Sequence, residues 1–125
     1  MKAKVNEIRV LLVGGDEVVE MAITSQIKDI LRHDLKTSQS LARARGRLAS
    51  EEYDLIVFEA DLQESGGLDL IRAVEDSNPG TRMIGISDDP VTRDTIESVG
   101  CTATGRSTFP EVLRVEIREI CKTTA

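Results

Sequence analysis

The chain has 125 residues, a mass of 13.7 kDa, a formal net charge of -6 and a pI near 4.8. This acidic balance argues against nucleic-acid binding, which requires a clustered basic surface. The sequence has no apolar run of the roughly 18 residues that a membrane span requires, and its first residues lack the apolar core of a signal peptide. We therefore expect one cytoplasmic domain over residues 1–125, long enough to bury a core.

The first part of the chain predicts a strand followed by a helix. Ile8–Val13 is an apolar run that ends at Gly14 and Gly15, which is typical of a buried strand breaking into a turn. Asp16 stands at the expected N-cap of a helix. Apolar residues at helical spacing extend this helix to Leu31.

The next segment predicts an edge strand and a basic helix. Asp34–Ser38 has only a weak alternation of apolar residues, which suits an edge strand. Ser40 is placed to cap the helix that follows. This helix carries Arg43, Arg45 and Arg47 outside its narrow apolar stripe. A solvated helix face is the simplest interpretation, and a binding patch is the alternative.

The central strand delivers acidic residues to one edge of the predicted sheet. Leu55–Phe58 is a continuous apolar run, as in a strand buried on both faces of a parallel sheet, and it ends at Glu59. Open α/β sheets place their sites beyond the carboxyl ends of such strands, so Glu59 and Asp61 are candidate site residues. A helix beginning near Leu68 should follow and end at the turn signal 77–80.

A fourth strand and helix come next. Met83–Ile86 predicts a strand in which Gly85 admits a close neighbour. Pro90 is typical of the first position of a helix, here predicted over Val91–Val99. Gly100 should end this helix, because glycine readily adopts the left-handed conformation that follows a helix.

The chain closes with a short strand and a long helix. Thr102–Gly105 predicts the strand, and Thr108 with Glu111 forms a capping-box pattern that announces the helix. Five strands thus alternate with five helices. This alternation predicts an α/β fold with a doubly wound parallel sheet and helices on both faces.

From Asp54 to Ile71 the sequence resembles the receiver domains of the response-regulator family, which are CheY-like. In that pattern a strand ends at a phosphoacceptor aspartate, and a loop with a final glycine, here Gly67, leads into a helix. The resemblance covers nearly the whole chain. It implies a flavodoxin-like (βα)5 fold with strand order 2-1-3-4-5, and a role in two-component signal transduction and phosphorelay.

The resemblance also implies where the family's phosphorylation site would lie, and several of its residues are changed. The acid pair that helps to hold Mg²⁺ falls on Gly14 and Gly15, and the phosphoacceptor falls on Glu59. The hydroxyl residue after the fourth strand is kept as Ser87. The remaining positions are the aromatic switch, which falls on Thr104, and the lysine, which falls on Ser107 with Arg106 beside it.

These changes predict a degenerate receiver, or pseudo-receiver, that is not an enzyme, needs no cofactor and acts through protein–protein interaction without phosphorylation. Glu59 would then be either a fixed negative charge, paired with Arg106 if that side chain turns inward, or a relic of the site. The family commonly binds protein partners through the fourth helix, fifth strand and fifth helix, here residues 91–123. We expect neither a nucleic-acid nor a membrane partner, and the oligomeric state stays open.

The sequence allows two alternative functions. In the first, Asp16, Glu59 and Asp61 together bind a divalent cation such as Mg²⁺, and Glu59 or Asp61 accepts phosphate. Three carboxylates without a metal would repel one another, and Asp16 is explained equally well as a helix N-cap. In the second alternative, the chain is a small flavodoxin-like ligand-binding or enzymatic domain. No glycine-rich phosphate-binding motif supports that reading.

Overall fold

A computed structural model describes residues 7–62 and 67–123. These residues form one five-stranded parallel sheet of order β2-β1-β3-β4-β5, which confirms the doubly wound fold predicted from the sequence. The strands are β1 (Glu7–Val13), β2 (Arg32–Ser38), β3 (Leu55–Glu59), β4 (Arg82–Ile86) and β5 (Thr102–Thr104). The helices are α1 (Glu17–Ile27), α2 (Leu41–Ser50), the 3₁₀ turn η1 (Ala60–Leu62), α3 (Leu68–Ser77), α4 (Pro90–Ser98) and α5 (Phe109–Thr123).

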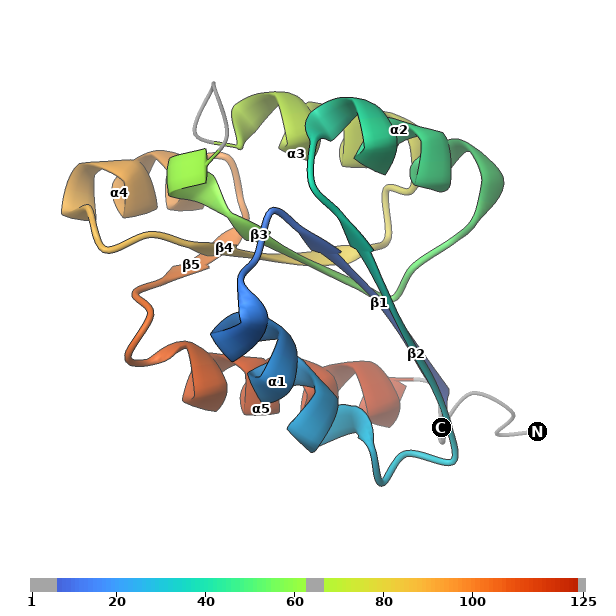
Figure 1. Cartoon of the computed structure of the whole chain (residues 1–125). Coiled ribbons are helices and arrows are strands. Elements are labelled where there is room, and N and C mark those ends of the chain that lie inside the picture. The colour runs from blue at the N-terminus through green and yellow to red at the C-terminus, as the bar shows by residue number, and fades with distance from the viewer. Residues whose placement is uncertain (1–6, 63–66, 124–125) are drawn as a thin grey trace.

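The helices cover both faces of the sheet, as Figure 1 shows: α1 and α5 lie on one face, and α2, α3 and α4 lie on the other. Successive residues of a strand point to opposite faces, so the inner strands feed two separate cores. Leu12 packs with the α1–α5 layer, whereas Leu11 and Val13 pack with the opposite layer. Because both faces are covered, all five residues of β3 are buried. Among the described helices, none is both long and apolar enough to cross a membrane.

The ring of Phe58 explains two glycines, Gly85 within β4 and Gly67 at the start of α3. A Cβ atom added to Gly85 would lie 2.7 Å from Phe58 Cζ, and one added to Gly67 would lie 2.2 Å from Phe58 Cε2. Gly67 also has a φ of 93°, in the left-handed region that favours glycine. The prediction that Gly85 admits a close neighbour is therefore confirmed.

Three helix starts are capped as helix chemistry requires. The side chains of Asp16, Ser40 and Asp89 accept hydrogen bonds from backbone N–H groups in the first turns of α1, α2 and α4. Gly100 follows α4 with a φ of 89°, as predicted. These contacts fix the direction in which each helix leaves the carboxyl edge of the sheet.

The predicted end of the first helix is wrong. The helix ends at Ile27, and Leu31 is 78% exposed rather than part of its buried face. The chain leaves the helix early because β2 begins at Arg32, where it pairs with Glu7 of β1, two residues before the predicted strand. Pairing along the full length of β1 therefore takes precedence over helical periodicity at this junction.

The capping box predicted at the start of the last helix does not form as expected. Thr108 Oγ1 lies 2.6 Å from Thr104 Oγ1 and also donates to the backbone oxygen of Gly105. The N–H group of Glu111 instead donates to the backbone oxygen of Thr108, at 3.1 Å. The hydroxyl of Thr108 is thus used to close the turn between β5 and α5.

Candidate functional site

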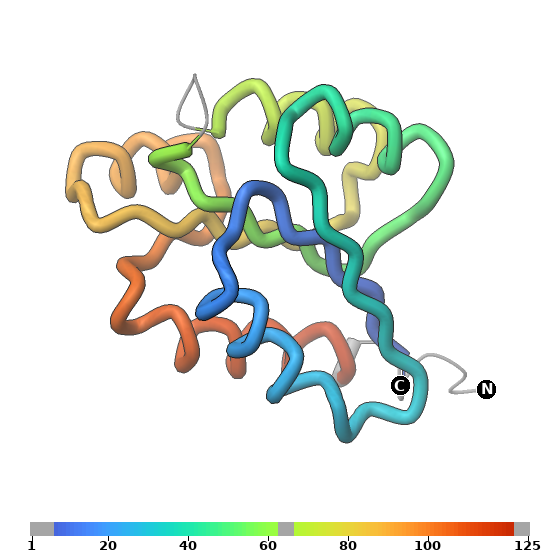
Figure 2. Tube along the Cα trace, viewed as in Figure 1, coloured from blue at the N-terminus to red at the C-terminus, as the bar shows by residue number. Residues whose placement is uncertain are grey.

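The candidate site lies at the carboxyl edge of the sheet, where the turns after β1, β3 and β5 come together in the left half of Figure 2. Glu59 is the last residue of β3 and is only 6% exposed. It pairs in register with Ile86 of β4, which belongs to the core under α1 and α5. The Glu59 carboxylate therefore reaches the edge of the sheet from a buried position on that face.

Arg106 binds this carboxylate. It lies in the turn between β5 and α5, and its Nη1 group donates to Glu59 Oε1 while its Nη2 group donates to Asp16 Oδ2. The side chain of Arg106 is 38% exposed, against 7% for Glu59. Hydrogen bonds to Glu59 and then to Asp16 raise the pKa of Arg106 above its usual value. One guanidinium group thus joins the ends of β1, β3 and β5, and we call this Asp16–Arg106–Glu59 arrangement the arginine bridge.

Asp16 serves two purposes at once. Its Oδ1 atom accepts a hydrogen bond of 3.0 Å from Val19 N, which caps α1, while Oδ2 receives Arg106. The backbone bond from Val19, followed by the bond from Arg106, lowers the pKa of the Asp16 carboxyl. Asp16 therefore contributes a negative charge to the bridge and also fixes the start of α1.

Gly14 and Gly15, at the family's acid-pair positions, lie where backbone conformation and close packing favour glycine. Gly14 has a φ of 71°, which strains any residue with a side chain. A Cβ atom at Gly15 would lie 2.6 Å from Leu12 Cδ1, a core atom. A carboxylate residue at position 14 would therefore have to adopt the left-handed conformation, and one at position 15 would require the Leu12 side chain to move.

Ser87 and Asp61 form a second contact beside the bridge. Ser87 is 1% exposed, and its hydroxyl donates to Asp61 Oδ1 at 2.8 Å and accepts from Asp89 N at 3.0 Å. Asp61 lies in the exposed turn η1. The Ser87 hydroxyl therefore links the two loops that follow β3 and β4 by hydrogen bonds.

The turn after β5 is tied to the loop after β4. Asp88 Oδ1 accepts from Arg106 N at 2.9 Å, and Arg93 Nη1 donates to the backbone oxygen of Ser87 at 2.8 Å. A Cβ atom at Gly105 would lie only 3.1 Å from Asp88 Oδ1, so glycine permits this close approach. The backbone segment that carries Arg106 is thus held from the side of α4 as well.

Thr104, at the position predicted for the aromatic switch, is buried and contacts another hydroxyl group. Thr104 is 4% exposed, and its Oγ1 atom contacts Thr108 Oγ1 within the same turn. Ser107, which falls on the family's lysine, is exposed and lines a groove next to α4. The structure brings Arg106, and not Ser107, to Glu59.

Sequence reasoning missed Asp88 and Arg93. The signal available for Asp88 was an acidic residue directly after the hydroxyl residue at the end of a parallel strand, where site residues gather. Arg93 had no such signal, because an arginine in the first turns of an exposed helix is usually solvated.

The side chains present do not fit a divalent cation. The guanidinium of Arg106 occupies the place between Asp16 and Glu59 that a cation would need, and Asp61 is directed to Ser87. Within residues 7–62 and 67–123, no group of three or more His, Cys, Asp and Glu side chains is arranged to hold a metal ion. The positive charge at this edge is supplied by the chain itself.

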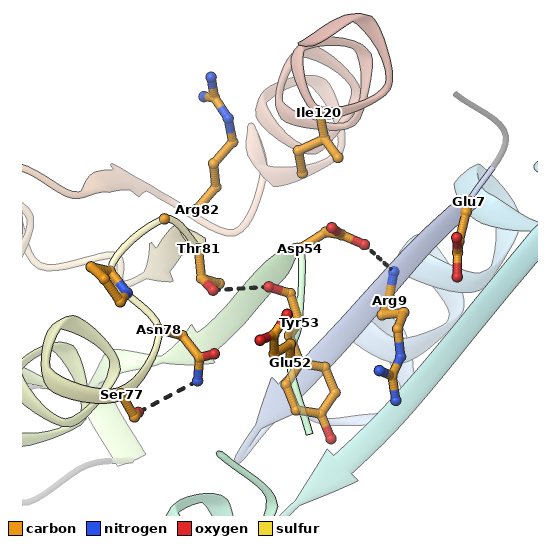
Figure 3. Close-up of a pocket in the computed structure, with 12 residues that line it drawn as sticks. Glu7, Arg9, Glu52, Tyr53, Asp54, Ser77, Asn78, Thr81, Arg82 and Ile120 are labelled. Carbon is orange, nitrogen blue, oxygen red and sulfur yellow. Dashed lines mark hydrogen bonds between the residues drawn. The ribbon is translucent and has the colours of Figure 1, made fainter. Parts of the chain in front are cut away.

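A pocket of about 480 Å³ lies at the opposite edge of the sheet, as Figure 3 shows. Its polar groups bond to one another: Arg9 N donates to Asp54 Oδ2, and Thr81 Oγ1 donates to the backbone oxygen of Tyr53, both at 2.8 Å. Burial, and then the hydrogen bond to Glu51, raise the pKa of Tyr53 to about 12. These groups stabilise the junction of β1, β3 and β4 and do not converge on a ligand.

Solved structures of receiver domains are similar to this chain. The signal receiver domain of an HD domain-containing protein from Pseudomonas fluorescens Pf-5 has a TM-score of 0.74 at 20% identity, with 94% of this chain and 97% of that chain covered. The beryllofluoride-activated NtrC4 receiver domain dimer has a TM-score of 0.75 at 17% identity, with both chains fully covered at 100%. The chemotaxis response regulator CheY4 of Vibrio cholerae has a TM-score of 0.71 at 15% identity, with coverage of 91% and 98%.

No protein-family model matches the sequence, and no curated protein sequence matches it. At these identities the structural similarities show that the chain has the fold of CheY-like receiver domains.

Proposed function

We propose that the chain is a receiver-like signalling module that works without phosphorylation and acts by binding a protein partner. The observation that carries the proposal is the arginine bridge: Arg106 joins Asp16 and Glu59 at the edge where the receiver fold places its phosphorylation chemistry. In-line phosphoryl transfer depends on positioning and on metal-assisted neutralisation of charge. Here the acceptor-position carboxylate is already neutralised by a guanidinium group.

The bridge supports a single conformation of the domain. A receiver that responds to phosphate needs two states of different affinity for its partner. In this chain Glu59 supplies a permanent charge, and Arg106 holds the turn after β5 against it. The Asp88 contact to Arg106 N and the Arg93 contact to Ser87 then fix the entry to α4. Glu59 therefore stands in for the phosphorylated aspartate, and Arg106 pairs with it as the family's lysine would.

The surface formed by α4, β5 and α5 is the proposed partner-binding face. A groove of about 510 Å³ lies there, between the acidic side chains Asp94 and Glu97 of α4 and the half-buried Val112 of α5. Its floor includes Thr104 and Gly105, which belong to the segment held by the bridge. A rigid, mostly polar groove of this kind suits a specific interface whose geometry is set in advance.

A second candidate function is phosphoryl acceptance at Asp61. This carboxylate is exposed and bonds to the Ser87 hydroxyl, so a phosphodonor could reach it. If Asp61 accepts phosphate, the chain gains a phosphoryl group; in the proposed function it gains none.

Intact-mass spectrometry after incubation with Mg²⁺ and acetyl phosphate separates the two. We expect no change in mass. A gain of one phosphoryl group that is stable in acid and labile in alkali would contradict the proposal, and the Asp61→Asn and Glu59→Gln variants would then identify the acceptor. The DrrB receiver domain, whose structure is described as BeF3-activated, is a suitable positive control.

A further inference from the structure

Helix α2 has an outer face that the proposed function does not use. Its ten residues include three arginines and no acidic residue, in a chain whose formal net charge is -6. Ala44 and Leu48 bury the inner face against the sheet. In Figure 1, α2 lies in the upper helix layer beside α3, on the side away from α4.

The arginines of α2 are not all explained by contacts within the chain. Arg47 is half-buried and interacts with Tyr53 and Glu51 at the end of the helix. Arg43 and Arg45 are exposed, and neither forms an ion pair with any described residue. Within residues 7–62 and 67–123, two positive charges of α2 are therefore presented to solvent without an ion-pair partner.

Arg43 stands where a positive charge is unfavourable for the helix. It lies in the first turn, and its N–H group donates to the Ser40 side chain that caps α2. The N-terminal end of a helix carries partial positive charge, so acidic residues are preferred there. Arg43 adds to this charge instead of balancing it. Arg45, two residues further on, projects from the other side of the outer face, so the two arginines flank Gly46.

Gly46 is a second residue of α2 whose identity the packing of the helix does not explain. It lies in the interior of α2 and is exposed, and a Cβ atom added there would meet nothing within 4 Å. Its φ is not positive, because the positive-φ glycines are Gly14, Gly67 and Gly100. Glycine lowers helix propensity, so its use here weakens the helix without any packing benefit among the residues that the structure describes.

Local features that weaken a fold without compensation are expected at functional surfaces. We propose that the outer face of α2 docks an acidic helical segment of a partner protein. Carboxylates of that segment pair with Arg43 and Arg45, and its backbone approaches α2 closely over Gly46, where no side chain intervenes. This interface lies on different elements from α4, β5 and α5, so it is independent of the proposed function.

A protein segment fits this surface better than a polyanion does. The overall charge of -6 repels long anionic polymers and anionic membranes, because the field of the whole chain acts over about a Debye length, roughly 10 Å. A short segment with a few carboxylates meets only the local positive surface. Charge complementarity therefore selects an acidic segment of limited length.

The test uses ¹⁵N-labelled protein and a synthetic helical peptide with glutamates on one face and alanines on the other. At low ionic strength we expect saturable amide shifts confined to residues 41–50, and no such shifts with the same peptide carrying lysines. The Arg43→Gln/Arg45→Gln variant should bind about fivefold more weakly, as expected for the loss of two exposed ion pairs. Arg114→Gln/Arg118→Gln, on the exposed side of α5, changes the net charge equally and should leave the affinity unchanged.

Gly46 variants separate docking from helix stability. Gly46→Ala and Gly46→Leu should both stabilise α2, and both should weaken peptide binding, the leucine more strongly than the alanine. Peptide shifts outside α2, equal losses in the two arginine variants, or stronger α2 shifts with an oligonucleotide or with anionic vesicles would each overturn the proposal. The peptide titration follows amide signals of α2, whereas the phosphorylation assay follows the mass of the chain, so the failure of this proposal and that of the proposed function are distinguishable.

Discussion

Replacing Arg106 with glutamine should destabilise the fold by about 2 kcal/mol, because the Glu59 carboxylate would stay buried without its cation. Within the described residues, Arg106 is the hydrogen-bonding partner of Glu59, and the Glu59 side chain is 7% exposed. Removing one member of a fully buried pair costs roughly 3–5 kcal/mol. The exposure of Arg106 to solvent reduces that figure. Urea unfolding followed by circular dichroism measures the change.

Two further variants identify the buried charge as the cause. Glu59→Gln should destabilise less than Arg106→Gln, because Arg106 can still pair with Asp16 and reach solvent. The double variant should recover most of the stability lost in Arg106→Gln, because no unpaired carboxylate remains. Arg114→Gln is the matched control and should change stability by no more than about 0.5 kcal/mol. An Arg106→Gln variant as stable as this control would show that the bridge is not part of the fold.

Replacing Gly67 with alanine should have a still larger effect, about 3 kcal/mol or more. The φ of 93° at Gly67 disfavours a side chain by about 1–2 kcal/mol. The added Cβ atom would also lie 2.2 Å from Phe58 Cε2, and Phe58 is fully buried at 0% exposure. Overpacking of this kind costs about 1–3 kcal/mol more. The midpoint of urea or thermal unfolding should therefore fall sharply.

Gly80→Ala is the control for this prediction. Gly80 is exposed, and a Cβ atom there would meet nothing within 4 Å. Its stability should stay within about 0.5 kcal/mol of the original chain. If both variants lost equal stability, the contact between Gly67 and Phe58 would not be the reason for glycine at position 67.

The fold was predictable because its signals are local and agree with one another. The apolar run Leu55–Phe58 forms an inner strand, as its lack of alternation indicated, and Asp16 and Ser40 cap their helices. The alternation of strands and helices then leaves few arrangements for a parallel sheet. Junctions were less predictable: Leu31 lies outside α1 because pairing between β1 and β2 extends further than helical periodicity suggests.

The site was predictable in its location but not in its contacts. Residues at the carboxyl ends of β1, β3, β4 and β5 were expected to meet, and they do. Which side chain of the turn after β5 reaches Glu59 depends on the path of that turn. The hydroxyl of Thr108 and the carboxylate of Asp88 shape it; the position of Asp88 after a parallel strand was a signal for a site residue, but nothing in the sequence indicated its contact with Arg106 N. The same contacts explain why Ser107 faces a groove while Arg106 faces Glu59.

We propose that the pair of Glu59 and Arg106 takes the place of the phosphorylated aspartate and its cations at this edge of the receiver fold. The most direct measurement is a comparison of ¹⁵N–¹H spectra recorded with and without Mg²⁺ and beryllofluoride, with the DrrB receiver domain as positive control. We predict that the amide signals of Glu59, Ser87, Thr104 and Arg106 stay in place while those of the control domain move. Saturable shifts of these four signals would contradict the claim, because they would show that the site still accepts a metal and a phosphate analogue.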